Sequence, residues 1–258
     1  MPSEKRQRQR ENSQARQQAL AAAAAKRKRR TQTIIAVAAV VIIGGAVFWA
    51  TEGGSDKSTS AAPTTTTTIK LLKGNADKCP PAEGTAKKLQ SFAHEPPSCI
   101  DASKKYTATV KTDIGSITFD LFPEVAPHTV NNFVFLARNH YYDGIIFHRV
   151  IPDFMDQTGD PLGNGTGGPG YTIPDEFSPD HAFADGDVAM AKTSEANSGG
   201  SQFFIVDGTQ GQALPPEYTY FGHVTKGLAV VKKINKDGSG GGKPNVTHHI
   251  VSVTITEE

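Results

Sequence analysis

The chain has 258 residues, enough for one substantial domain with additional segments, and its 27 basic and 26 acidic residues almost cancel. The charges are unevenly placed: residues 1–30 hold ten Lys and Arg against only Glu4 and Glu11, so the remainder is acidic overall. This asymmetry predicts a basic tail on a mildly acidic globular body. Nucleic acid is not expected as a partner.

The tail, residues 1–30, has Gln and Ala between its charges, which is typical of a solvated, disordered segment. Binding of nucleic acid or of anionic lipid is the alternative for such a basic stretch.

Residues 31–51 carry no charge. As a helix this segment would span about 31 Å, close to the ~30 Å hydrocarbon core of a bilayer. The basic cluster 26–30 precedes it, so the positive-inside rule places the N-terminus in the cytoplasm and everything after residue 51 outside. We therefore expect a single-pass protein of the cell membrane with the lipid bilayer as a partner. A cleaved signal peptide, cut near Gly44-Gly45-Ala46, and a buried core helix are the alternatives.

Residues 52–68 contain a run of five threonines and lack a periodic apolar face, which predicts a flexible linker. Residues 69–103 form an extension that contains the two cysteines of the chain, Cys79 and Cys99. Outside the membrane, a disulfide between them is favoured over a zinc site, and two free thiols are the alternative.

From residue 104 to 258 the pattern is that of a compact domain. Alternating residues around Asp113-Ile114-Gly115 predict a hairpin, and Pro127 can open a helix. We predict strands over 107–112, 116–121, 145–150, 154–158, 188–191, 202–206, 220–225 and 249–256, and helices from 127 and over 227–234. Many short strands with glycine-rich connections and only two helices indicate a mainly β fold, a closed antiparallel barrel.

Two stretches carry the candidate chemistry: residues 147–157, Phe-His-Arg-Val-Ile-Pro-Asp-Phe-Met-Asp-Gln, and residues 199–206, Gly-Gly-Ser-Gln-Phe-Phe-Ile-Val. Each offers large apolar side chains beside a few polar groups, the combination that binds small apolar ligands. Either stretch alone would be read as ordinary barrel core.

These stretches, with Gly-Asn-Gly-Thr-Gly-Gly at 163–168, Ala-Met-Ala at 189–191 and Phe-Gly at 221–222, resemble the cyclophilin signature in order and spacing over about residues 104–257. The resemblance implies a peptidyl-prolyl cis–trans isomerase: an eight-stranded barrel capped by two helices, with the active groove on its outer face and proline-containing polypeptides as substrates. No cofactor or metal is expected.

The resemblance also implies roles for single residues. Arg149 matches the catalytic arginine, Phe154, Met155 and Phe204 match the proline pocket, and Gln157 and Gln202 match amides that bind substrate and hold the arginine. We take Arg149, Phe154 and Gln157 as catalytic. The substrate-binding residues are then Met155, Gly165, Ala191, Lys192, Gln202, Phe204, Leu214 and Tyr218.

Three departures from the family pattern fall among these residues. Lys192 stands where the family has an asparagine, the family's tryptophan is lost beside Leu214, and Tyr218 replaces a histidine. Two functions are therefore weighed: an isomerase, favoured by Arg149 and its neighbours, and a binding module that captures proline-containing segments with little turnover.

Overall fold

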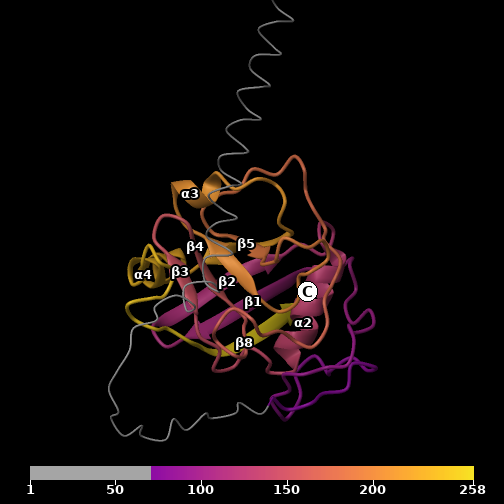
Figure 1. Ribbon diagram of the computed structural model, residues 1–258. Helices are drawn as coiled ribbons and strands as arrows, with labels where there is room; N and C mark the ends of the chain where they lie inside the picture. The colour runs from indigo at the N-terminus through magenta and orange to yellow at the C-terminus, as the bar shows by residue number, and fades with distance from the viewer. Residues whose placement is uncertain (1–70) are drawn as a thin grey trace, which may run out of the picture. The chain divides into compact units, whose positions relative to one another are not determined.

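The structure is a computed structural model that describes residues 71–258 (Figure 1). The predicted tail (1–30), membrane span (31–51) and linker (52–68) lie outside the described residues. Within 71–258, none of the helices has the length and apolar character needed to cross a membrane.

Eight strands form one antiparallel sheet in the order β3-β4-β6-β5-β7-β2-β1-β8. The predicted hairpin is present, with Thr112 opposite Gly115 at its turn. The strands are β1 (Tyr106–Thr112), β2 (Gly115–Leu121), β3 (Arg149–Ile151), β4 (Met155–Thr158), β5 (Asp187–Met190), β6 (Phe203–Val206), β7 (Tyr220–Lys226) and β8 (Ile250–Glu257).

The sheet curls so far that its two edges meet: the segment before β3 bonds to the start of β8 and to the residues just before it. The N–H of Gly144 donates to the carbonyl of Ile250 (2.7 Å), and that of Phe147 donates to the carbonyl of His248 (2.9 Å). The predicted strand over 145–150 was wrong in extent, because residues 145–147 bond to this rim segment and β3 begins only at Arg149. In place of the predicted closed barrel, the structure shows a curled eight-stranded antiparallel sheet, whose two edges are joined by these bonds.

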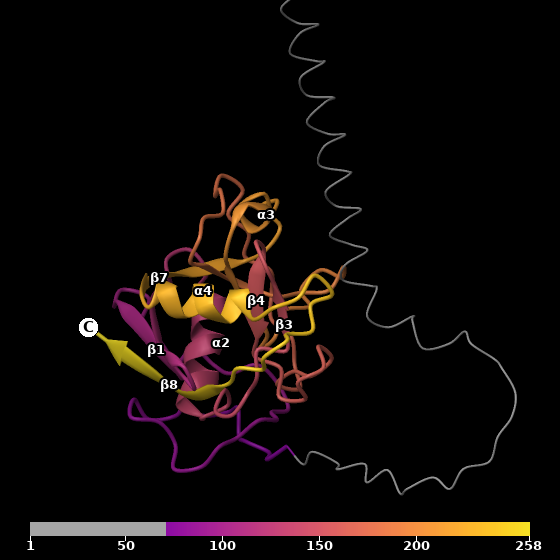
Figure 2. The ribbon, with the colours of Figure 1, turned by 90° about the vertical axis from the view of Figure 1, so that its left-hand side faces the viewer.

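Two helices lie on opposite sides of the curled sheet, α2 (Pro127–Arg138) and α4 (Leu228–Lys236) (Figures 1 and 2). Both were predicted. A third, α3 (Thr209–Gln212), was not, so the prediction of two helices was incomplete for residues 71–258. With four residues, α3 is too short to show apolar periodicity.

The interior of the curled sheet is filled by aromatic side chains. Phe133 of α2 lies 5.7 Å from Phe119, 5.5 Å from Phe203 and 5.6 Å from Phe221, measured between ring centroids. Every residue of β5 and of β6 is buried, unlike the alternating pattern of β1. Because neighbouring residues of a strand point to opposite faces, the outer face of β5 and β6 must also be covered.

The extension packs on this body along α2. Phe92 is buried, with its ring 4.9 Å from that of Phe135, and its N–H donates to the carbonyl of Pro169 (2.8 Å). Gln90 Nε2 donates to the carbonyl of Tyr141 (3.0 Å). The described part of the extension is therefore built into the domain.

A disulfide joins Cys79 and Cys99, which are 20 residues apart in sequence. We expect both cysteines to resist alkylation unless a reductant is added. Opening a loop of this length should lower the free energy of unfolding by about 3 kcal/mol, mainly because the unfolded chain gains entropy. Urea unfolding with and without dithiothreitol measures this loss, and a Cys79→Ala/Cys99→Ala variant should be insensitive to the reductant. Alkylation of both thiols without reductant would contradict the bridge.

His248 is buried between two carboxylates, with Nδ1 3.0 Å from Asp113 Oδ2 and Nε2 2.9 Å from Asp237 Oδ2. Burial lowers its pKa, but the bonds to Asp237 and Asp113 outweigh burial and raise the pKa above its ordinary value. A raised pKa stabilises the fold below about pH 6.5, the unfolded value, and that stability is lost as the pH rises through the folded value.

We therefore expect the free energy of unfolding of the wild type, relative to a His248→Gln variant, to fall as the pH is raised above about 6.5. Urea unfolding across a pH series measures the difference. The neighbouring Thr247, which is exposed and does not titrate, provides the matched control: Thr247→Ala should follow the wild-type pH dependence. Parallel curves for wild type and His248→Gln would show that folding does not change the pKa of His248, and would contradict the raised value.

Candidate active site

The predicted site residues are aligned by the register of four neighbouring strands. Arg149 of β3 lies opposite Gln157 of β4, Gln157 lies opposite Phe204 of β6, and Phe204 lies opposite Ala189 of β5. Residues directly opposite one another in a sheet project from the same face. Side chains that are distant in sequence thus form one row, on the face turned away from the aromatic interior.

A chain of hydrogen bonds links the arginine to the glycine-rich loop. Arg149 Nη1 donates to Gln157 Oε1 (3.2 Å), and Gln157 Nε2 donates to Gln202 Oε1 (2.9 Å). Gln202 Nε2 donates to the carbonyls of Gly165 (3.0 Å) and Gly167 (2.9 Å). Each amide accepts on the arginine side and donates on the loop side, so the orientation of both glutamines is determined by their partners.

Apolar residues of the row and around it form what we call the outer-face cluster, which is separate from the aromatic interior. Its buried members are Met155, Phe183, Ala189, Phe204, Val206 and Leu214, against which Ile151, Phe154, Ala191, Tyr218 and Tyr220 pack. The rings of Phe204 and Tyr218 meet edge to face at 5.4 Å. This cluster covers the outer face of β5 and β6 and explains why both strands are completely buried.

Arg149 lies at the edge of the cluster. Its Cζ is 5.8 Å from the ring centroid of Phe154, and Nη1 is 3.8 Å from Met155 Sδ. Nη2 is buried and has no hydrogen-bond partner within residues 71–258. Burial lowers the pKa of Arg149, an effect that Tyr218 partly opposes, but an arginine remains charged in proteins. The site therefore holds a partly desolvated cation with a free donor beside an apolar surface.

Tyr218 faces the same cation. Burial raises the pKa of its hydroxyl, and the charge of Arg149 works in the opposite direction. Tyr218 is therefore a neutral hydroxyl at physiological pH, able to donate a hydrogen bond at the edge of the outer-face cluster.

Gly165 lies in a loop that is organised by one buried carboxylate. Asp160 Oδ2 accepts from the N–H of Asn164 (3.0 Å) and of Gly165 (2.5 Å), and Oδ1 accepts from the N–H of Leu162 (2.7 Å). Gly165 has φ = +90°, a conformation that favours glycine. The loop thus presents the carbonyls to which Gln202 bonds.

Lys192 is the predicted residue whose side chain the structure does not bring to the others. Its Nζ lies 3.2 Å from Asp175 Oδ2 and 5.0 Å from the ring centroid of Phe177. The ammonium group forms an ion pair with Asp175 in a neighbouring loop. The substrate-binding role of Lys192 stays a prediction.

The sequence did not indicate several residues that the structure adds to this site. Ala189 and Val206 could have been found, since each lies two residues from a predicted member of its strand and hence on the same face. Phe183 and Asp160 come from irregular segments without periodicity. Gly242 packs against Arg149, for a Cβ there would lie 3.2 Å from Arg149 Cγ, and no sequence pattern indicates this contact.

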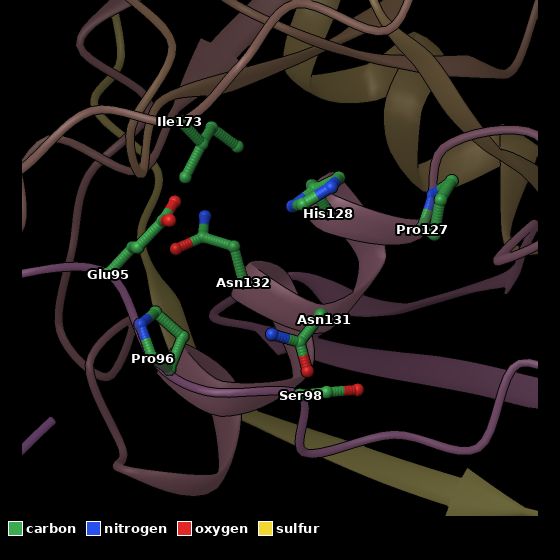
Figure 3. Close-up of a pocket in the computed structure, with 8 residues that line it drawn as sticks. All are labelled: Glu95, Pro96, Ser98, Pro127, His128, Asn131, Asn132 and Ile173. Carbon is green, nitrogen blue, oxygen red and sulfur yellow. The ribbon is translucent and has the colours of Figure 1, made fainter. Parts of the chain in front are cut away.

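A pocket of about 350 Å³ lies elsewhere, between the extension and the first turns of α2 (Figure 3). Glu95 and Asn132 point toward one another across it. The side-chain amide of Asn131 is bonded to the backbone of Pro97 and Cys99. That of Asn132 is bonded to the carbonyl of Gly200 and to the hydroxyl of Tyr171. The pocket shares no lining residue with the row of Arg149. In the same described residues, no group of three or more His, Cys, Asp or Glu could hold a metal ion.

Comparison with known proteins bears on the same part of the chain. The family described as cyclophilin type peptidyl-prolyl cis-trans isomerase/CLD matches residues 107–255. Peptidyl-prolyl cis-trans isomerase B of Bacillus subtilis is 48% identical over 124 residues, which cover 48% of this chain and 85% of that protein. An isomerase of Dictyostelium discoideum is 40% identical over 151 residues, which cover 57% of this chain and 96% of that protein.

A solved structure of a cyclophilin type peptidyl-prolyl cis-trans isomerase of Cryptosporidium parvum is similar, with 30% identity, a TM-score of 0.55 and coverage of 60% of this chain and 99% of that one. A second, described as in the presence of the dipeptide Ala-Pro, has 32% identity, a TM-score of 0.55 and coverage of 59% and 99%. The matched family, these relatives and the shared fold show that this chain belongs to the cyclophilin-type peptidyl-prolyl cis–trans isomerases and is an enzyme with that activity.

Proposed function

We propose that Arg149, the glutamine chain and the outer-face cluster form the site at which this enzyme isomerises X–Pro bonds. We propose further that its substrates are polypeptides outside the cytoplasmic membrane, whose folding it accelerates. The observation that carries the first proposal is the buried Nη2 of Arg149, which has no hydrogen-bond partner in the described part of the chain (71–258) and lies beside an apolar surface. The similar structure described with Ala-Pro is consistent with a proline-containing ligand.

The reaction requires little covalent machinery. Rotation about an X–Pro bond must cross a barrier of roughly 18–20 kcal/mol, because the twisted amide loses its resonance. Loss of resonance returns a lone pair to the prolyl nitrogen. A donor that bonds to this lone pair acts on the twisted state and not on the planar one, so it lowers the barrier.

Arg149 meets this requirement. Gln157 holds Nη1, which leaves Nη2 to donate to the twisted amide, and Phe154 and Met155 provide an apolar surface for the prolyl ring. A surface that excludes water strengthens the bond to the cation. Five decades of acceleration would require about 7 kcal/mol, which one charge-assisted hydrogen bond and an apolar clamp can together supply.

The location outside the membrane is supported by two features. The basic cluster 26–30 precedes the uncharged segment 31–51, and the bridge Cys79–Cys99 is of the kind that persists in oxidising compartments. On this proposal residues 31–51 anchor the enzyme, residues 1–30 lie in the cytoplasm, and the linker 52–68 holds the domain away from the bilayer.

We expect protease added to intact cells or protoplasts to release a fragment that begins within residues 52–75 and retains isomerase activity toward a proline-containing peptide. Residues 1–30 should be cut only after lysis. The expected fragment keeps Cys79 and Cys99 bridged, which a mass measurement can verify. Cleavage of the domain only after lysis would reverse the proposed topology and leave the isomerase assignment intact.

A further inference from the structure

The turn that joins β3 to β4 carries two of the proposed site residues, Phe154 and Met155. It is tight, because the N–H of Phe154 donates to the carbonyl of Ile151 (3.1 Å). Asp153 in its middle has φ = +60°, a left-handed conformation that is unfavourable for a residue other than glycine. The turn therefore needs contacts from outside to hold its shape.

One set of contacts comes from α3. The carboxylate of Asp153 accepts from the N–H of Thr209 (2.7 Å) and from its hydroxyl (2.8 Å), and the N–H of Gln210 donates to the carbonyl of Asp153 (3.0 Å). Asp153 is exposed, so these bonds stabilise the solvent-facing side of the turn.

The other set comes from one buried amide of α4, the helix that lies beside β3 and β4 (Figures 1 and 2). Asn235 Nδ2 donates to the carbonyl of Ile151 (3.0 Å) and to Asp156 Oδ1 (2.8 Å). Asn235 Oδ1 accepts from the N–H of Asp153 (3.1 Å). A single side chain thus bonds to the first, middle and last parts of the segment 151–156.

Asp156, the last residue of this segment, is one of the three partners that determine which way this amide points. It is fully buried between Met155 and Gln157, with Oδ1 bonded to Asn235 and Oδ2 without a partner within residues 71–258. Burial raises its pKa well above the ordinary value; the bond from Asn235 opposes this only in part, and the smaller effects of Asp207, which raises the pKa, and Lys232, which lowers it, follow. A neutral Asp156 offers its carbonyl oxygen to the NH₂ end of Asn235, which leaves the amide oxygen for Asp153.

We propose that Asn235 is a positioning residue for catalysis, which sets the place of Phe154 and Met155, and through Met155 that of Arg149, from behind the sheet. The proposal rests on the function proposed for the outer-face cluster. Met155 Sδ lies 3.8 Å from Arg149 Nη1, so a displacement of the turn reaches the guanidinium directly.

The test compares Asn235→Ala with Val231→Ala in the full-length chain. Val231 is buried on the same helix but belongs to the interior cluster, so its truncation destabilises the fold without removing a bond to segment 151–156. Asn235→Ala should lower kcat/KM by about tenfold to a hundredfold, with a lower kcat and a higher KM, since small misplacements of catalytic groups are costly. Val231→Ala should retain kcat at a temperature at which both variants are folded.

A structural readout that does not depend on catalysis is the methyl signal of Met155 in carbon-labelled protein, with the buried Met190 as an internal reference. Asn235→Ala should shift or broaden the Met155 signal and leave that of Met190 in place, whereas Val231→Ala should leave Met155 in place. If Asn235→Ala does not fold, Asn235→Leu gives the same readouts, since it keeps most of the buried volume and loses all three bonds to segment 151–156.

An unmoved Met155 signal in the Asn235 variant would overturn the positioning role. A moved signal with normal turnover would show that Asn235 holds the turn but that this does not affect catalysis, and would overturn the proposal; the function proposed for the outer-face cluster is tested separately by Arg149→Ala. A moved signal with reduced kcat supports the proposal.

Discussion

Arg149→Ala should lower both kcat and kcat/KM by about a hundredfold or more, the effect typical of removing one donor that acts on the transition state. The two parameters should fall together, because Nη2 bonds chiefly to the twisted amide and contributes little to binding of the planar substrate. A protease-coupled assay with a proline-containing peptide measures both.

Arg149→Lys should not restore activity. Lysine keeps the charge, but it lacks the planar guanidinium that bonds to Gln157 through Nη1 while Nη2 stays free. Phe154→Ala should behave differently, since an apolar wall contacts planar and twisted states alike, and its loss should raise KM as well.

Stability provides the control for the arginine variants. Arg149 is half-buried at the edge of the outer-face cluster and outside the aromatic interior, so Arg149→Ala should unfold within about 1 kcal/mol of the wild type. A folded Arg149→Ala protein with near-normal turnover would end the catalytic role of this residue and favour a site that only binds proline-containing segments.

Phe92→Ala should lower the free energy of unfolding by about 3–5 kcal/mol, as expected when a buried aromatic ring is removed and leaves a cavity. The ring is 4% exposed and packs on Phe135, and a Cβ added at Gly74 would lie 2.2 Å from its Cε1. The backbone of Phe92 also meets the glycine-rich loop at Pro169 and Gly170. Loss of the ring should therefore loosen the extension.

Urea unfolding of the full-length chain measures this loss, and trypsin should cut the variant faster than the wild type at the lysines of the extension. The matched control is Leu72→Ala, since Leu72 is 50% exposed and its truncation should change stability by less than about 0.5 kcal/mol. A Phe92→Ala protein as stable as the Leu72→Ala protein would show that the extension is only tethered to the domain.

The sequence alone determined the elements whose pattern is local. The hairpin around residues 113–115, the helix that Pro127 opens and the strands with alternating residues follow from periodicity and turn chemistry, which depend only on near neighbours along the chain. The motifs at 147–157 and 199–206 also made Arg149, Gln157 and Phe204 candidate site residues without structure, because the family signature consists of short runs of consecutive residues.

Only the tertiary structure decided what depends on contacts between distant segments. The first turn of α2 has no side-chain cap of its own, and Glu176 supplies one by accepting from the N–H groups of His128 (3.0 Å) and Thr129 (2.9 Å). The strand predicted over 145–150 was too long because its first residues bond to the rim segment before β8. Such pairings are set by which backbone groups meet when the sheet curls, and no local pattern encodes them.

The site divides in the same way. That Arg149 and the glutamines belong together could be predicted from their motifs, and that Lys192 turns to Asp175 could not, since Asp175 lies in an irregular segment 17 residues earlier. The support of the β3–β4 turn by Asn235 was equally invisible, because it joins residues about 80 positions apart through three bonds of one amide. Periodicity predicts which face of an element is buried, whereas the partner that a buried polar group finds depends on the packing of the whole domain.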